Sequence, residues 1–158
     1  MHKQYYQATI ETPMGPMVAV ADEYYLYRLD FADKYKIQNT IAKKVAPLES
    51  IEQELASYFS GLLKQFTTPL KPQGTDFQQQ VWRALQTIPF GETWSYLQLA
   101  QAVNKPTAYR AVANANGKNP LSIIIPCHRV INHNGQLGGY AGGLNRKIAL
   151  LKHEGIED

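Results

Sequence analysis

The feature that most constrains the fold is a proline- and glycine-rich break near the middle of the 158-residue chain. Pro69, Pro72 and Gly74 stand close together there, and such a composition interrupts helices and strands alike. Each side of the break is long enough for one small domain. We therefore expect an α+β protein with an N-terminal α/β domain over residues 1–73 and a mostly helical C-terminal domain over residues 74–158.

The N-terminal half has the pattern of three antiparallel strands followed by a helix. Residues 5–31 are rich in β-branched and aromatic side chains, and turn-forming compositions interrupt them at residues 12–16 and 22–23. The apolar positions of the helix recur at helical spacing: Ile51, Leu55, Tyr58, Phe59 and Leu62. Packing between strands explains the tyrosines of this half, so we expect a scaffold without a functional site.

The C-terminal half begins with a helix and continues with a helix-turn-helix outline. Thr75 or Asp76 can cap the first helix. Its apolar stripe is formed by Phe77, Val81, Trp82, Leu85 and Ile88. Two shorter helices are expected over residues 95–103 and 107–116, with a turn at residues 104–106 between them. A last helix is expected over residues 145–153.

The second helix of this pair is rich in small residues. Four of them are expected to pack inward: Ala108, Ala111, Val112 and Ala115. Four are expected to face outward: Arg110, Ala113, Asn114 and Gly117. Small side chains around one arginine would let the helix approach a nucleic-acid backbone closely. An ordinary alanine-rich packing helix with a solvated arginine has the same pattern, so both interpretations stay open.

The basic charge is concentrated in the second half. Residues 1–73 carry 8 basic and 8 acidic side chains, whereas residues 74–158 carry 8 and 5. Between Arg83 and Lys147, 7 basic side chains face a single acid, Glu92. A polyanionic partner fits this imbalance, although a solvated basic surface would show it too.

Cys127 is the only cysteine, which excludes an intramolecular disulfide. The chain starts without an apolar leader and has no apolar run of 18 residues, so we expect an intracellular, unanchored protein of the cytoplasm, associated with the nucleoid when it is bound to DNA. Residues 121–125 have strand composition and lead directly into Cys127 and His128. A neighbouring imidazole would favour a reactive thiolate, whereas an inert, buried cysteine is the alternative. Adjacent residues on a strand point to opposite faces, so His128 reaches the thiol only at a turn or through a water.

The glycine-rich segment 135–143 can line a pocket or serve as a flexible connector. It lacks the spacing of a phosphate-binding loop. Cys127, His128 and His133 could supply metal ligands, but the spacing typical of zinc sites is absent, so no metal is expected. Downstream, the carboxylate of Glu154 can orient His128.

Six short motifs follow one another in the second half. They are Tyr96, Arg110-Ala111-Val112, Asn119-Pro120, Ile125-Pro126-Cys127-His128-Arg129-Val130, Gly139-Tyr140-Ala141-Gly142-Gly143 and His153-Glu154-Gly155. In order and spacing they resemble the O6-alkylguanine-DNA alkyltransferases, also called methylated-DNA–protein-cysteine methyltransferases. The first half resembles the ribonuclease H-like domain of that family only in size and in its strand-then-helix character.

The resemblance implies irreversible, single-turnover DNA repair without a cofactor. An alkyl group moves from O6-alkylguanine to the Cys127 thiolate after the base has been flipped out of the helix, and O4-alkylthymine is a second candidate substrate. His128, oriented by Glu154 and acting through a water, would remove the thiol proton. Tyr96 would donate to the leaving guanine, and Asn119 would order the active-site turn.

The resemblance also implies a DNA interface and a base pocket. Arg110 would replace the extruded base while the helix pair lies in the minor groove of double-stranded DNA. Contacts from Ala113, Asn114, Gly117 and Tyr96 would complete the DNA-binding surface of a monomer. The pocket would be lined by the Tyr140 ring, by the amides of Val130 and Ala141, and by Gly142.

Two departures from the family pattern bear on these expectations. Many members carry serine at the position of Ala141, but the implied contact there comes from the main-chain amide, so we expect activity to be retained. Some members bind a structural zinc through N-terminal cysteines and histidines, of which this half has only His2, so that zinc is not expected. A non-catalytic branch replaces the nucleophile with tryptophan, whereas this chain has Cys127.

Two other functions compete with alkyl transfer. A helix-turn-helix module that only senses lesions or regulates transcription would not need Cys127. A cysteine hydrolase using Cys127, His128 and Glu154 would turn over many times and would need an oxyanion hole. Direct contact between neighbouring nucleophile and base is awkward, which argues against the hydrolase.

Overall fold

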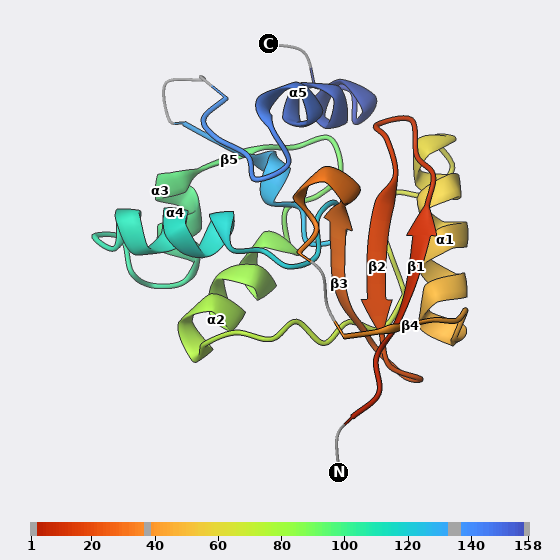
Figure 1. The fold of residues 1–158 in the computed structure, drawn as a ribbon. Coiled ribbons are helices and arrows are strands. Elements are labelled where there is room, and N and C mark those ends of the chain that lie inside the picture. Colours follow the sequence, from red (N-terminus) through yellow and green to blue (C-terminus); the bar gives the residue numbers. More distant parts are fainter. Residues whose placement is uncertain (1–2, 37–38, 133–136, 157–158) are drawn as a thin grey trace. The chain divides into compact units, whose positions relative to one another are not determined.

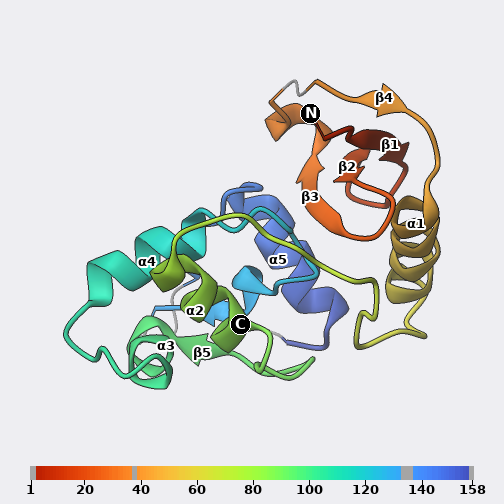
Figure 2. The ribbon, with the colours of Figure 1, turned by 90° about the horizontal axis from the view of Figure 1, so that it is seen from below.

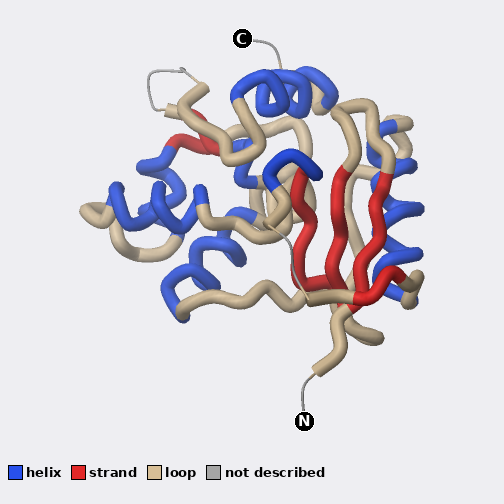
Figure 3. The backbone as a smooth tube through the Cα atoms, viewed as in Figure 1, coloured by secondary structure: helices blue, strands red, loops and turns tan. Residues whose placement is uncertain are grey.

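The computed structural model describes residues 3–36, 39–132 and 137–156, which form two compact units, Met1–Gln73 and Gly74–Asp158 (Figure 1). The first unit combines a small sheet with one long helix, and the second is mostly helical (Figure 3). The α+β prediction is therefore confirmed. His2 and His133, considered above as metal ligands, lie outside the described residues, as do Gly135 and Gln136 of the glycine-rich segment.

The sheet of the first unit has the strand order β3-β2-β1-β4. Strands β1 (Tyr6–Ile10), β2 (Met17–Ala21) and β3 (Leu26–Phe31) are antiparallel neighbours, as predicted, and the short β4 (Ile41–Ala42) adds in parallel to β1. The central strand β2 is buried along its whole length, so its side chains form much of the core of this unit. A single 3₁₀ turn, η1 (Ala32–Lys34), follows β3.

Helix α1 (Ala46–Phe59) lies beside this sheet (Figures 1 and 2). The side chains of Leu48, Ile51, Leu55 and Tyr58 are buried on one face, which is the helical spacing seen in the sequence. Leu62 was expected to continue that stripe, but the helix ends before Gly61, whose φ is +82°, and Leu62 is 83% exposed. Glycine tolerates the left-handed conformation that stops a helix, and the chain then turns away from the core.

The second unit contains α2 (Asp76–Leu85), α3 (Tyr96–Ala102), α4 (Tyr109–Gly117) and α5 (Leu144–His153). Thr75 caps α2 through a reciprocal capping box with Gln78, and Ser95 caps α3 in the same way with Gln98. The turn between α3 and α4 places Asn104 at φ 59°, a conformation that asparagine tolerates better than most residues. The expected helix pair is therefore present.

Two short parallel strands bring distant segments of this unit together. Strand β5 (Trp94–Ser95) pairs with β6 (Val130–Ile131), with Trp94 opposite Val130. The first strand leads directly into α3, and the second follows the 3₁₀ turn η2 (Cys127–Arg129). The pairing therefore fixes the start of α3 beside the segment that carries the cysteine.

Residues 121–125 do not form the strand that their composition predicts. The Ile124 amide donates to the Ser122 carbonyl at 2.9 Å, and the Ile125 amide donates to the Leu121 carbonyl at 3.0 Å. Ile123, at the centre of these turns, has φ +74° and is buried. These local hydrogen bonds replace sheet pairing, and burial of the isoleucine side chains explains the apolar composition.

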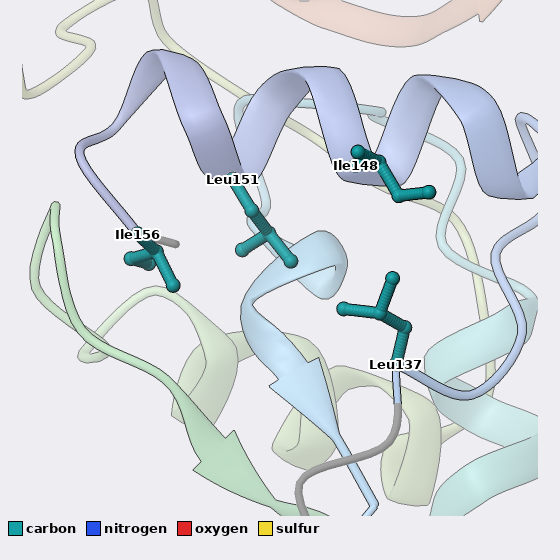
Figure 4. A pocket seen from close by; sticks show the side chains of 4 residues that line it. All are labelled: Leu137, Ile148, Leu151 and Ile156. Carbon is teal, nitrogen blue, oxygen red and sulfur yellow. The ribbon is translucent and has the colours of Figure 1, made fainter. Parts of the chain in front are cut away.

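A small apolar cavity of about 20 Å³ lies beneath α5 in the second unit. Its walls are formed by Leu137, Ile148, Leu151 and Ile156, which point toward one another (Figure 4). The lining side chains are all apolar, and a cavity of this size is a packing gap rather than a binding site. Among the helices that the structure describes, none combines the length and the apolar character needed to cross a lipid bilayer.

Candidate active site around Cys127

The segment that carries Cys127 is held by one asparagine side chain. The Asn119 Nδ2 donates to the Ile125 carbonyl at 2.7 Å and to the Cys127 Sγ at 3.2 Å, and its Oδ1 accepts from the Leu121 amide at 2.9 Å. Pro126 lies at φ −82° and ψ 63°, and the Cys127 amide donates back to the Ile125 carbonyl at 2.8 Å. This tight turn presents the thiol at the start of η2.

A buried ionic cluster lies directly beyond the thiol. His128 Nε2 lies 2.8 Å from Glu154 Oε2, and Arg129 donates to both oxygens of Glu154, at 2.7 and 3.0 Å. The Arg129 Nη1 also donates to the Ile88 carbonyl at 2.7 Å. All three side chains are buried, so the fork of Arg129 satisfies a carboxylate that water does not reach.

The electrostatics of this cluster define the tautomer of His128. Burial alone would raise the pKa of Glu154, but hydrogen bonds from His128 and Arg129 lower it to about 2. Burial lowers the pKa of His128, and the hydrogen bond and charge of Glu154 offset only part of that decrease. The imidazole is therefore neutral and faces an ionised carboxylate. The ring therefore carries its proton on Nε2 and donates to Glu154. Its Nδ1 is buried without a partner among the described residues and is free to accept a proton.

The thiol itself is buried next to a buried lysine. Burial raises the pKa of Cys127, and the hydrogen bond from Asn119 and the charge of Lys147 oppose that rise. The Lys147 ammonium, on α5, donates to the carbonyls of Val130 at 2.6 Å and Gly139 at 3.1 Å. Burial lowers the pKa of Lys147 to about 8, against the attraction of Cys127. The site is thus a protected thiol with nearby groups that favour its ionised form.

Tyr96 is the first residue of α3 and is buried to all but 8%. Burial raises the pKa of its phenol, neighbouring Cys127 and Tyr109 add to the rise, and a hydrogen bond from Asn116 opposes it. The phenol therefore keeps its proton at neutral pH and can act as a hydrogen-bond donor beside the thiol.

The glycine-rich segment contributes Tyr140 to the same neighbourhood. The ring centroids of Tyr140 and His128 are 6.5 Å apart, and the Tyr140 hydroxyl is buried without a partner among the described residues. Gly142 is buried, and Ala141 is exposed. The Val130 amide is already bonded to the Cys127 carbonyl, which differs from the free amide implied by the resemblance.

Helix α4 presents a mixed face to solvent. Arg110, Asn114 and Gly117 are exposed, and Ala113 is partly buried. The expectation that Ala111 packs inward is wrong, since it is exposed, and Ala108 is only partly buried. Burial is concentrated toward the end of the helix, at Val112, Ala115 and Asn116, because α4 packs there on α2, where Trp82 Nε1 donates to the Ala115 carbonyl at 2.9 Å.

The basic surface is smaller than the sequence count implies. Arg129 is 7% exposed and Lys147 is fully buried, so neither contributes to a charged surface. Both serve the buried site instead. The remaining basic residues between residues 83 and 147 are Arg83, Lys105, Arg110, Lys118 and Arg146, of which the first four are exposed.

Sequence reasoning did not place Arg129 and Lys147 in the buried site, and it did not single out Asn116. The first two were counted as surface charge, and charge patterning carries no signal that separates a buried cation from an exposed one. Asn116 stands among the small residues of α4, and only its burial singles it out. Within residues 3–36, 39–132 and 137–156, no group of three or more histidine, cysteine or carboxylate side chains is arranged to hold a metal ion.

The chain is similar to known proteins over nearly its full length. Residues 76–156 match the family described as 6-O-methylguanine DNA methyltransferase, DNA binding domain, and residues 5–72 match the ribonuclease-like domain of the same proteins.

Two curated relatives carry the name methylated-DNA–protein-cysteine methyltransferase. The protein from Methanosarcina barkeri is 48% identical and covers 94% of this chain and 96% of its own. The constitutive protein from Bacillus subtilis is 46% identical and covers 92% of each chain. A crystal structure of Mycobacterium tuberculosis OGT in complex with DNA superposes with a TM-score of 0.88 at 43% identity, covering 95% of this chain and 93% of that one.

Proposed function

This chain belongs to the O6-alkylguanine-DNA alkyltransferase family, and we propose that it repairs DNA by moving the alkyl group of O6-alkylguanine onto its own Cys127. The observation that carries the assignment to Cys127 is the buried site itself. The only cysteine of the chain stands on a tight turn, next to a neutral histidine. The Nδ1 atom of that histidine has no hydrogen-bond partner among the described residues. The reaction is a direct reversal of damage that consumes one protein molecule per lesion.

The chemistry follows from the protonation states of the site. The thiol proton passes through a water to Nδ1 of His128, whose imidazolium form is stabilised by the ionised Glu154. The thiolate then attacks the alkyl carbon, so that the sulfur–carbon bond forms as the bond from that carbon to O6 breaks. Tyr96 donates a hydrogen bond to the departing guanine, where negative charge develops.

Asn119 and Arg129 hold the reacting groups in place. The Asn119 amide group contacts the sulfur and the turn that presents it, so it both orients the thiol and favours its ionised form. Arg129 fixes Glu154 through two hydrogen bonds, one to Oε1 and one to Oε2, the oxygen that His128 also contacts. We place Asn119 at the reacting sulfur and Arg129 as a positioning residue.

We place double-stranded DNA on the exposed face of α4, in its minor groove. Arg110 is exposed there and would enter the base stack in place of the flipped nucleotide. A Cβ added at Gly117 would meet no protein atom within 4 Å, so packing within the protein does not require glycine at that position. A small residue on this exposed face, together with Ala113 and Asn114, fits close approach of a nucleic-acid backbone.

The extruded base would occupy a pocket between α3 and the glycine-rich segment. The Tyr140 ring would stack on the base, and Ala141 and Gly142 would form the wall beside it. Since the Val130 amide is engaged within η2, we assign Val130 a packing role in this wall rather than a donor role. Residues 1–73 would act as a scaffold for a monomer that works on DNA inside the cell.

Counting repaired lesions against protein molecules tests this function. A duplex with one O6-methylguanine, supplied in excess, should lose one methyl group for each wild-type molecule and then stop. Cys127→Ala should repair none while still binding the duplex. Continued turnover beyond one equivalent would instead indicate a hydrolase, and binding without any loss of methyl groups would indicate a lesion sensor.

A further inference from the structure

Three buried side-chain atoms of the described chain have no hydrogen-bond partner, and all three belong to the second unit: Asn116 Oδ1, His128 Nδ1 and Tyr140 Oη. Buried polar atoms in folded proteins are nearly always bonded, so unpaired atoms of this kind indicate groups that a ligand completes. The proposed reaction gives roles to His128 and Tyr140. It gives none to Asn116.

Asn116 stands in the last turn of α4 and is 5% exposed. Its backbone position is anchored, because the carbonyl of the preceding residue, Ala115, accepts from Trp82 Nε1 at 2.9 Å. Helix α4 also contacts α3 through the rings of Tyr96 and Tyr109, whose centroids are 5.8 Å apart. The side chain is therefore held at the packed end of α4, out of solvent.

The neighbours of Asn116 belong to the reaction. Its side chain hydrogen-bonds the phenol of Tyr96, and that phenol interacts electrostatically with Cys127. A carboxamide offers both a donor and an acceptor. The hydrogen bond lowers the pKa of the phenol, as donation from the NH₂ group does. The acceptor Oδ1 is then left over, and it is the atom without a partner.

We propose that Asn116 is a specificity-determining residue whose Oδ1 accepts a hydrogen bond from the exocyclic amino group of the extruded guanine. One edge of guanine carries the acceptor N3 next to the donor 2-amino group. That order complements a phenol O–H next to an amide oxygen. O4-alkylthymine has a carbonyl oxygen in place of the amino group, so Asn116 also disfavours that lesion. The inference rests on the proposed alkyl transfer.

The proposed hydrogen bond is tested by removing the Asn116 side-chain amide and the 2-amino group of the base, separately and together. Single-turnover transfer to Cys127 is measured for wild type and Asn116→Leu on duplexes containing O6-methylguanine or O6-methylhypoxanthine, which lacks the 2-amino group. Wild type should react about tenfold faster with O6-methylguanine, because a missing partner leaves Oδ1 unpaired in the complex. In Asn116→Leu the two rates should agree within about twofold. Differences in base flipping between the duplexes are common to both proteins and cancel.

Gln80→Ala serves as the control, since it removes an exposed side-chain amide from α2 and should keep the wild-type preference. Asn116→Ser, which is small enough to avoid steric clash, replaces Asn116→Leu if that variant does not fold. Equal tenfold preferences in wild type and variant would overturn the inference while leaving alkyl transfer intact. No transfer by wild type on either duplex would instead overturn the proposed function.

Discussion

Glu154 is the residue on which the polar contacts of the site converge. It accepts from His128 and twice from Arg129, and these contacts hold its pKa at about 2 in spite of burial. The carboxylate therefore has two functions, since it fixes the histidine tautomer and it compensates a buried guanidinium. Substitution of Glu154 and of His128 should separate the two.

We predict that Glu154→Gln lowers both stability and transfer rate, whereas His128→Gln lowers mainly the rate. Loss of the carboxylate leaves Arg129 buried without its charge partner, which costs about 3–5 kcal/mol of unfolding free energy. Loss of the general base should slow transfer by about 10²-fold or more. Denaturant titrations and single-turnover assays measure the two effects, and DNA binding should change little in either variant. A binding defect as large as the rate defect would assign these residues a structural role.

Lys147 should control the ionisation of the nucleophile. We predict that Lys147→Met slows the reaction of Cys127 with iodoacetamide at pH 7 by about 3- to 10-fold, because the ammonium opposes the rise in the thiol pKa caused by burial. The pH dependence of alkylation should shift to higher pH. Lys152→Met is the matched control, since Lys152 is an exposed lysine of the same helix. An unchanged profile in Lys147→Met would show that the lysine only ties Val130 to Gly139.

At the scale of elements, the helices were the predictable part and the active-site segment was not. A capping residue and an apolar stripe located α2, because both signals are local in sequence. Residues 121–125 form turns because Asn119 supplies hydrogen bonds that a strand would otherwise need, and composition does not contain that contact. Ala111 was placed inward by helical spacing alone, yet packing on α2 determines which face of α4 is buried.

The exposed face of α4 should matter only when the base has to be extruded. We predict that Arg110→Ala slows repair of O6-methylguanine in duplex DNA by about tenfold or more, because no side chain then takes the place of the flipped base in the base stack. Its reaction with free O6-benzylguanine should stay within about twofold of wild type. Arg83→Ala, which removes an exposed charge from α2, controls for general electrostatic attraction. Equal losses on both substrates would refute the assigned role.

At the scale of the whole molecule, the site should make stability depend on pH. Folding lowers the pKa of His128 from its ordinary value of 6.5. As the pH falls below 6.5, the unfolded chain therefore binds a proton at this residue more readily than the folded chain does, and the unfolding free energy decreases. The pKa of Glu154 is lowered from 4.5 to about 2, so its contribution is full above pH 4.5 and is lost as the pH falls toward 2. Both groups therefore favour the folded state less in acid.

We predict that the unfolding free energy falls from about pH 6.5 downward and falls more steeply below pH 4.5. Urea titrations across this range measure it. Other carboxylates contribute to the acid limb, among them Asp22 of the first unit, whose pKa is lowered by its contacts with Lys3 and neighbouring amides despite burial. The difference between wild type and Glu154→Gln isolates the site, and it should shrink from pH 4.5 to pH 2. A difference that stays constant over this range would contradict the assigned ionisation.

The most direct test of alkyl transfer to Cys127 is mass spectrometry of the protein after reaction. Wild type and Cys127→Ala are incubated with a duplex containing one O6-methylguanine, and intact masses and peptides are then compared. We expect one added methyl group on the peptide that contains Cys127, reaching saturation at one equivalent and absent from Cys127→Ala. An unmodified Cys127 in protein that has bound the damaged duplex would contradict it.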